Sequence, residues 1–217
     1  MKNIITVYDN FFEDPNNVRN KALEQDFYYC DELRNIATLD EEDDNKILEI
    51  LKIGDVFPGQ RSLSCEKILP DIYKEFYKKI SSFMPNDNVT VNALFQRQTK
   101  DDYRNIHQDG VPFLGGLIYL DDNPAVNTGT CFYKHKETGW DGIEEEDSQK
   151  RYEYIKIRET ELDPSKGKIQ GQDNFEKHNA IGNKFNRMIM YNANMFHRAE
   201  GAEAERLTLS FFVYTGK

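Results

Sequence analysis

The segment "NIHQDG" places a histidine and an aspartate two residues apart, at His107 and Asp109. Because an extended chain points residues i and i+2 to the same side, this spacing can present an imidazole nitrogen and a carboxylate oxygen to one point. Such a pair is either half of a metal site or a simple hydrogen-bonded turn. The choice between them depends on ligands from elsewhere in the chain.

A third ligand is offered by His197, one of only four histidines in the chain. It leads through a polar turn into an alternating segment, residues 206–213, in which Arg206, Thr208 and Ser210 share one face and apolar residues take the other. An arginine and two hydroxyls beside a metal site would form a receptor for a carboxylate. His135, on another candidate strand, is the alternative ligand.

Two imidazoles and one carboxylate are the ligand set of non-haem iron oxygenases, in which they occupy one face of the Fe(II) octahedron. The other three positions accept a bidentate 2-oxo acid and O2. If that acid is 2-oxoglutarate, its far carboxylate needs a fixed cation, and the planar guanidinium of Arg206 suits this role. The order of these residues along the chain therefore indicates a candidate oxygenase site.

These residues resemble the Fe(II)/2-oxoglutarate-dependent dioxygenase superfamily, most closely its prolyl-4-hydroxylase-like branch. The family pattern is HxD, then a distal histidine, then an arginine nine or ten residues later; Arg206 follows His197 by nine positions. The segments "GGLIYLDD" and "GNKFNRMIMYNANMFHRAEG" resemble the family strands that follow HxD and lead to the distal histidine. The similarity covers roughly residues 89–215.

The resemblance implies both a metal site and a cosubstrate site. Fe(II) would be bound by His107, Asp109 and His197, with 2-oxoglutarate and O2 as cosubstrates and ascorbate as an optional reductant. The far carboxylate of 2-oxoglutarate would be anchored by Arg206, Tyr119 and Thr208. The implied reaction releases succinate and CO2 and hydroxylates an unactivated C–H bond of an amino acid, a peptide side chain or a small metabolite.

The elements that must position these residues follow from the hydrophobic periodicity. The sequence predicts an opening strand within residues 3–12 and then three helices. The first begins at Asp14 and Pro15, the second spans residues 40–54, and the third runs from Pro70 to Met84. Alternating segments then predict five strands, at residues 89–99, 113–120, 130–135, 187–192 and 206–214. Helices followed by strands favour a β-sandwich or jelly roll with helices on one face.

Together with the resemblance, this order predicts a mainly β (α+β) fold, a double-stranded β-helix with N-terminal helices packed on one face. We expect a single domain over residues 1–217, made of a helical support region (1–88) and a jelly-roll core (89–217). A polar segment at 140–183 is expected as an insertion that serves as a lid, a binding loop or a surface excursion.

Composition limits the partners. With 38 acidic and 28 basic residues the net charge is -10, which disfavours binding to nucleic acid or to anionic membranes. No apolar run suits a signal peptide or a membrane span, so a cytoplasmic protein is expected. The expected partner is a small-molecule or peptide substrate, and Arg198 could meet a carboxylate on it.

Two other classes of protein fit the same strands. One is a non-catalytic jelly roll that binds a sugar or a small acid, in which the histidines are incidental. The other is a structural or interaction protein that keeps an idle metal site. Fold alone does not separate these classes from an enzyme.

Overall fold

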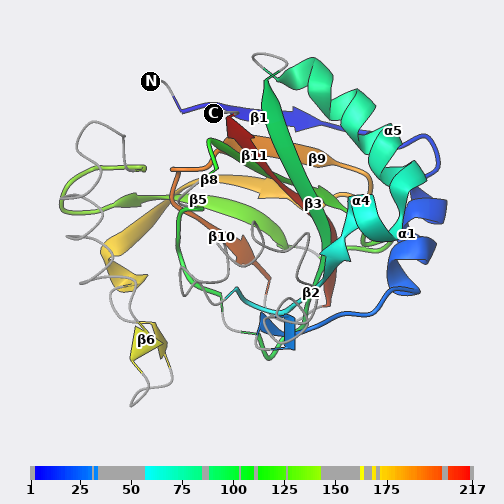
Figure 1. The fold of residues 1–217 in the computed structure, drawn as a ribbon. Coiled ribbons are helices and arrows are strands. Elements are labelled where there is room, and N and C mark those ends of the chain that lie inside the picture. The colour runs from blue at the N-terminus through cyan, green and yellow to red at the C-terminus, as the bar shows by residue number, and fades with distance from the viewer. Residues whose placement is uncertain are drawn as a thin grey trace.

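The computed structural model describes residues 3–30, 32–33, 57–84, 88–102, 104–109, 112–125, 127–142, 162–163, 168–169, 172–201 and 205–215. Two antiparallel sheets dominate the described part of the chain (Figure 1). The large sheet has the strand order β1-β9-β4-β11-β3-β2, and the small sheet has the order β10-β5-β8. The predicted double-stranded β-helix, or jelly roll, is confirmed.

The strands and helices have the following bounds. The large sheet contains β1 (Ile5–Tyr8), β2 (Gln60–Ser64), β3 (Val89–Gln98), β4 (Leu114–Tyr119), β9 (Met188–Asn192) and β11 (Arg206–Thr215). The small sheet contains β5 (Gly129–His135), β8 (Phe175–Gly182) and β10 (His197–Glu200), and β6 (Leu162–Asp163) pairs with β7 (Lys168–Ile169). The helices are α1 (Pro15–Leu23), α4 (Cys65–Ile68) and α5 (Pro70–Ile80), with short 3-10 turns η1 (Ser81–Phe83) and η3 (Gln172–Asn174).

The predicted helix starts are confirmed at α1 and α5. The Asp14 carboxylate accepts a hydrogen bond from the main-chain nitrogen of Asn17 at 3.1 Å, and Pro15 is the first helical residue. Helix α5 begins at Pro70 and buries one side chain per turn along the face that the sequence predicts. The helix expected at residues 40–54 lies outside the described residues. No helix in the described part of the chain combines the length and apolar character of a membrane span.

The apolar core lies between the large sheet and the helices. Strand β11 directs Leu207, Leu209, Phe211 and Val213 to this side, where the rings of Phe211 and Phe76 are 5.3 Å apart. Figure 1 shows the helices on one side of the large sheet and the small sheet on the other. The other face of β11 therefore points into the space between the two sheets.

Five strands were not expected from the sequence: β2, β8, β10 and the short pair β6 and β7. Strand β2 lies in the region 1–88 that was predicted to be helical, and it pairs with β3 at the edge of the large sheet. Strand β8 lies inside the predicted insertion 140–183, so that insertion was assigned too long at its C-terminal end. Apart from Phe175 at its start and the half-buried Ile181, the residues of β8 are exposed. An edge strand of this kind has no apolar alternation from which to be recognised.

Asn186 ties the N-terminal segment to the sheets. It adopts a left-handed backbone with φ 62° and is buried, at 5% exposure. Its side-chain amide accepts a hydrogen bond from the Phe12 nitrogen at 2.8 Å and donates one to the Phe12 oxygen at 2.9 Å. Its main-chain nitrogen donates to the Tyr119 oxygen at 2.8 Å. One residue therefore connects the segment before α1, through its side chain, to the end of β4, through its main chain.

We expect Asn186→Ala to lower the free energy of unfolding by about 2–4 kcal/mol, because two buried backbone groups of Phe12 lose their partners. Asn127→Ala is the matched control: Asn127 also has a left-handed backbone, with φ 66°, but it is exposed. The control substitution should lower the free energy of unfolding by about 1 kcal/mol, because only the left-handed backbone conformation is affected. Urea denaturation of both variants measures the difference, and equal losses would contradict this role of the side chain.

Candidate metal centre

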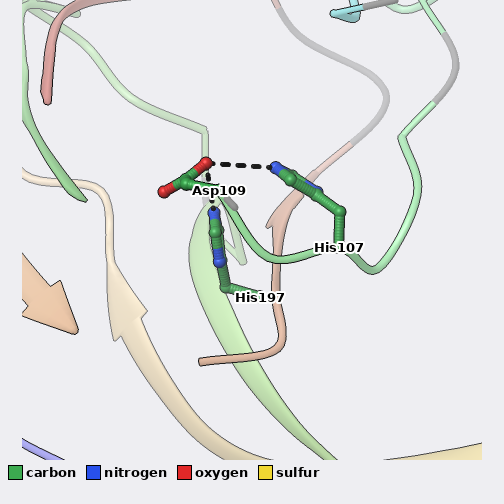
Figure 2. A group of neighbouring side chains, drawn as sticks. All are labelled: His107, Asp109 and His197. Atoms are coloured by element: carbon green, nitrogen blue, oxygen red, sulfur yellow. Dashed lines mark ion pairs between the residues drawn. The ribbon is translucent and has the colours of Figure 1, made fainter. Parts of the chain in front are cut away.

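His107, Asp109 and His197 converge on one point. The Nε2 atoms of His107 and His197 lie 3.8 Å and 3.7 Å from Oδ1 of Asp109, and the ligand atoms of the three residues are all within 4.8 Å of one another. Figure 2 shows both imidazoles directed at the carboxylate. These separations are too long for hydrogen bonds and leave room for an ion between the three atoms.

The backbone brings the two histidines together. The main-chain nitrogen of His107 donates to the His197 oxygen at 3.0 Å, and the nitrogen of His197 donates back to the His107 oxygen at 2.8 Å. The two residues thus form an antiparallel bridge, which places their side chains on the same side. Two residues further, the nitrogen of Asp109 donates to the Ala193 oxygen at 2.9 Å, which fixes the position of the third residue.

Hydrogen bonds and packing also orient both rings. The Nδ1 atom of His107 lies 3.0 Å from the Asn105 oxygen, and Nδ1 of His197 lies 2.9 Å from the Met195 oxygen. Since a carbonyl oxygen only accepts, each Nδ1 carries the hydrogen, and each Nε2 presents its lone pair to the centre. The ring of Tyr191 packs on His197 at 4.7 Å.

Burial keeps His197 neutral. Loss of water around the ring lowers the pKa of His197 to about 4, even though the nearby Asp109 carboxylate opposes this shift. At neutral pH the imidazole is therefore unprotonated, which is the form that binds a metal.

The carboxylate of Asp109 fits a cation. Its Oδ2 atom is buried and has no hydrogen-bond partner. A buried carboxylate oxygen without a hydrogen-bond partner is costly, and a cation held at Oδ1, the oxygen that faces both imidazoles, would offset that cost by compensating the shared charge. The space for this oxygen comes from Gly115 on β4, because a Cβ atom there would collide with Oδ2 and lie 3.2 Å from Cε2 of Tyr191. Two imidazoles and a carboxylate form a donor set suited to Fe(II).

Arg206, Tyr119 and Thr208, which the sequence analysis expects to bind a carboxylate, are all buried in the large sheet. Arg206 is buried, at 6% exposure, and its Nη1 donates to the Gly129 oxygen at 3.0 Å. Its Nη2 donates to Oγ1 of Thr130 at 3.3 Å, and that hydroxyl is also 2.9 Å from the hydroxyl of Tyr119. The guanidinium carbon lies 5.2 Å from the centre of the Tyr119 ring. The hydroxyl of Thr130 therefore links Arg206 to Tyr119, and the sequence analysis did not identify this threonine.

Thr208 has a different partner. It is opposite Tyr119 in the β11–β4 register, but its hydroxyl lies 3.1 Å from Oγ of Ser210 and not against Arg206. Thr130 could have been found from the alternation of β5, because it shares the inner face with Phe132. Of the residues predicted to bind a carboxylate, Arg206 and Tyr119 therefore lie together, and Thr130 from β5 connects them.

Two other residues considered in the sequence analysis, His135 and Arg198, have partners away from the three ligands. His135, the alternative ligand, is buried beside Phe175, with ring centres 5.3 Å apart, and its Nδ1 meets Oγ1 of Thr138 at 2.9 Å. It is not a member of the cluster of potential ligands among the described residues. Arg198 is paired with Glu200, with Nη2 2.6 Å from Oε1, so its charge already has a partner within the protein.

The fold is that of the Fe(II)/2-oxoglutarate-dependent oxygenases. HygX from Streptomyces hygroscopicus, solved with nickel and 2-oxoglutarate bound, is similar with a TM-score of 0.55 at 13% identity, over 97% of this chain and 82% of that chain. Its complex with nickel, 2-oxoglutarate and hygromycin B gives a TM-score of 0.54 at 12% identity, over 97% and 82%. A prolyl hydroxylase from Trichoplax adhaerens, in complex with a hypoxia-inducible-factor oxygen degradation domain peptide, gives 0.50 at 10% identity, over 97% and 83%.

By sequence, residues 53–210 match a family described as a family of unknown function (DUF6445), and the chain belongs to this family. No curated protein matches the chain. At 10–13% identity the structural similarities establish the fold, while the reaction has to be argued from the site.

We expect Gly115→Ala to weaken Fe(II) binding by at least about tenfold, because the added methyl group displaces the Asp109 carboxylate. Gly182→Ala, in β8, is the matched control, since a Cβ atom there meets nothing within 4 Å. Anaerobic titration of Fe(II) by calorimetry measures both variants. Wild-type affinity in Gly115→Ala would show that the carboxylate does not need this space.

Proposed function

We propose that this protein is an Fe(II)- and 2-oxoglutarate-dependent oxygenase. The observation that carries the proposal is the convergence of His107, Asp109 and His197 on one point inside an oxygenase fold, with Oδ2 of Asp109 buried and unpaired. Such a cluster is costly for a protein that binds no cation, because the carboxylate loses its hydration without gaining a partner. The same feature argues against a binding or structural protein in which these residues are incidental.

Each residue has a role in this proposal. His107, Asp109 and His197 hold Fe(II), and Arg206 with Tyr119 binds the far carboxylate of 2-oxoglutarate, which places the keto acid end toward the metal. Thr208, one strand from Tyr119, lines the same inner face. The bound iron supplies the oxidation of a C–H bond, coupled to conversion of 2-oxoglutarate and O2 to succinate and CO2.

The chain itself supplies orientation and exclusion of water. The two Nδ1–H groups donate to backbone oxygens, so each imidazole is held with its Nε2 lone pair toward the centre. Tyr191, which is buried, remains protonated because burial and the Asp109 charge both raise its pKa. It therefore presents a neutral ring against His197 and adds no second negative charge beside the carboxylate.

The similar solved structures support the proposed substrate class. The structural neighbours were solved with hygromycin B and with a peptide, so the fold admits both small and polypeptide ligands. For this chain we propose hydroxylation of an unactivated C–H bond in an amino acid, a peptide side chain or a small metabolite. Its charge of -10 weighs against nucleic acid as the substrate.

The test is anaerobic addition of Fe(II) and then 2-oxoglutarate, followed by the visible charge-transfer absorption of the chelate. We expect the band in the wild type, its loss in His107→Ala, and a large decrease in 2-oxoglutarate affinity in Arg206→Gln. His178→Ala is the matched control, because His178 lies exposed on β8 and is outside the cluster. That variant should give the wild-type band.

Succinate release on exposure of the loaded protein to O2 then tests turnover. A folded wild type with iron in excess that gives no band would overturn the oxygenase proposal and favour a non-catalytic jelly roll. A band without any succinate release, across a screen of amino acids and peptides, would instead favour a protein with an idle metal site.

A further inference from the structure

Arg104, three residues before His107, forms no ion pair with an acidic side chain of the described residues, although the charges of Asp102 and Glu200 act on it. Its Nη2 donates to the Thr99 oxygen at 3.2 Å, whereas Nε and Nη1 are buried and have no hydrogen-bond partner. The nearby carboxylates are used elsewhere: Asp102 accepts from the nitrogen and hydroxyl of Thr99, and Glu200 accepts from Arg198. Buried N–H groups without acceptors are uncommon in folded proteins.

Arg206 is in the same situation. Its Nη atoms contact an uncharged carbonyl and hydroxyl, its Nε is buried and unpaired, and it forms no ion pair with the residues that the structure describes. The two arginines lie near each other. After burial, the charge of Arg206 has the largest effect on the pKa of Arg104, and both effects lower it.

Four other arginines of the described segments have carboxylate partners. Arg19 pairs with Asp122, Arg97 with Glu205, Arg187 with Asp9 and Arg198 with Glu200. The chain has more acidic than basic residues, yet no described carboxylate forms an ion pair with Arg104 or Arg206. Two cations that repel each other in a region of low dielectric constant are expected where an external anion completes the site.

The position of Arg104 indicates which anion this is. Thr99, its hydrogen-bond partner, directly follows Gln98, and Gln98 is the residue opposite Arg206 in the β11–β3 register. Arg104 therefore lies at the end of the barrel where β11 begins. The metal cluster is further along that strand, since Gly115, which makes room for Asp109, is opposite Phe212.

We propose that Arg104 and Arg206 together bind the far carboxylate of the 2-oxo acid, so that Arg104 makes the site selective for dicarboxylic 2-oxo acids. This inference rests on the proposed function. A carboxylate has about four lone-pair positions, enough to accept N–H groups from two guanidinium forks. Three nitrogen atoms without hydrogen-bond partners, Nε and Nη1 of Arg104 and Nε of Arg206, are the donors available for it.

The experiment compares two ligands of equal chain length, 2-oxoglutarate and 2-oxopentanoate, which lacks the far carboxylate. Their dissociation constants are measured anaerobically on the Fe(II)-loaded protein from the chelate absorption. We expect Arg104→Gln to weaken 2-oxoglutarate about ten- to hundredfold and to change 2-oxopentanoate less than about twofold. Arg104→Lys, which keeps the positive charge, should lose less affinity for 2-oxoglutarate than Arg104→Gln does. Arg97→Gln, on neighbouring β3 with its own partner Glu205, should change neither constant.

Thermal unfolding of the ligand-free, metal-free protein provides a second readout. Because Arg104→Gln removes a repulsion, its melting temperature should equal or exceed that of the wild type. An arginine with a purely structural role would give a lower melting temperature, and a variant that fails to fold would likewise overturn the inference.

The outcomes separate this inference from the proposed function. If the wild type binds 2-oxoglutarate and Arg206→Gln loses it while Arg104→Gln does not, the inference fails and the oxygenase site stands. If Arg104→Gln weakens both ligands equally, its effect is on the metal centre and the inference also fails. If the wild type binds neither ligand, the proposed function itself fails.

Discussion

The site depends on one backbone interaction, the antiparallel bridge between His107 and His197. Each residue donates its main-chain N–H to the other's carbonyl oxygen, although they are 90 positions apart in the chain. In such a hydrogen-bonded pair the two side chains leave the backbone on the same side. The positions of both imidazoles, and of Asp109 two residues later, are therefore fixed by the main chain, while packing and Nδ1 hydrogen bonds set only the ring orientation.

The two faces of the large sheet have different roles: one forms the apolar core and the other carries the polar residues of the candidate site. Its helix-facing side holds the largest apolar cluster of the described residues, whereas its inner face carries Arg206, Thr208 and Ser210, all buried. A buried arginine without a carboxylate destabilises the ligand-free fold, so the apolar layer must offset that cost. The cationic interior also contrasts with the net charge of -10, which means that local charges, in a medium of low dielectric constant, determine which anion binds.

Elements with a strong local signal could be predicted from the sequence, and elements without one could not. Helix α1 has its N-cap Asp14 followed by Pro15, and the strands β3, β4, β5, β9 and β11 alternate or are continuously apolar, so their places were found. Strand β2 and strand β8 lie at sheet edges and are mostly exposed or half-buried. Their existence follows from pairing with β3 and β5, and pairing partners are not encoded in local periodicity.

By itself the sequence determined which residues share a face: His107 with Asp109, and Arg206 with Thr208, because the side-chain period of an extended chain is two. Only the tertiary structure decided which faces meet. It joined Arg206 to Thr130 on β5 and gave Arg198 a carboxylate partner, whereas Arg104 has none among the described residues. These outcomes depend on register between strands distant in the chain, which is set by the packing of whole sheets and not by any short segment.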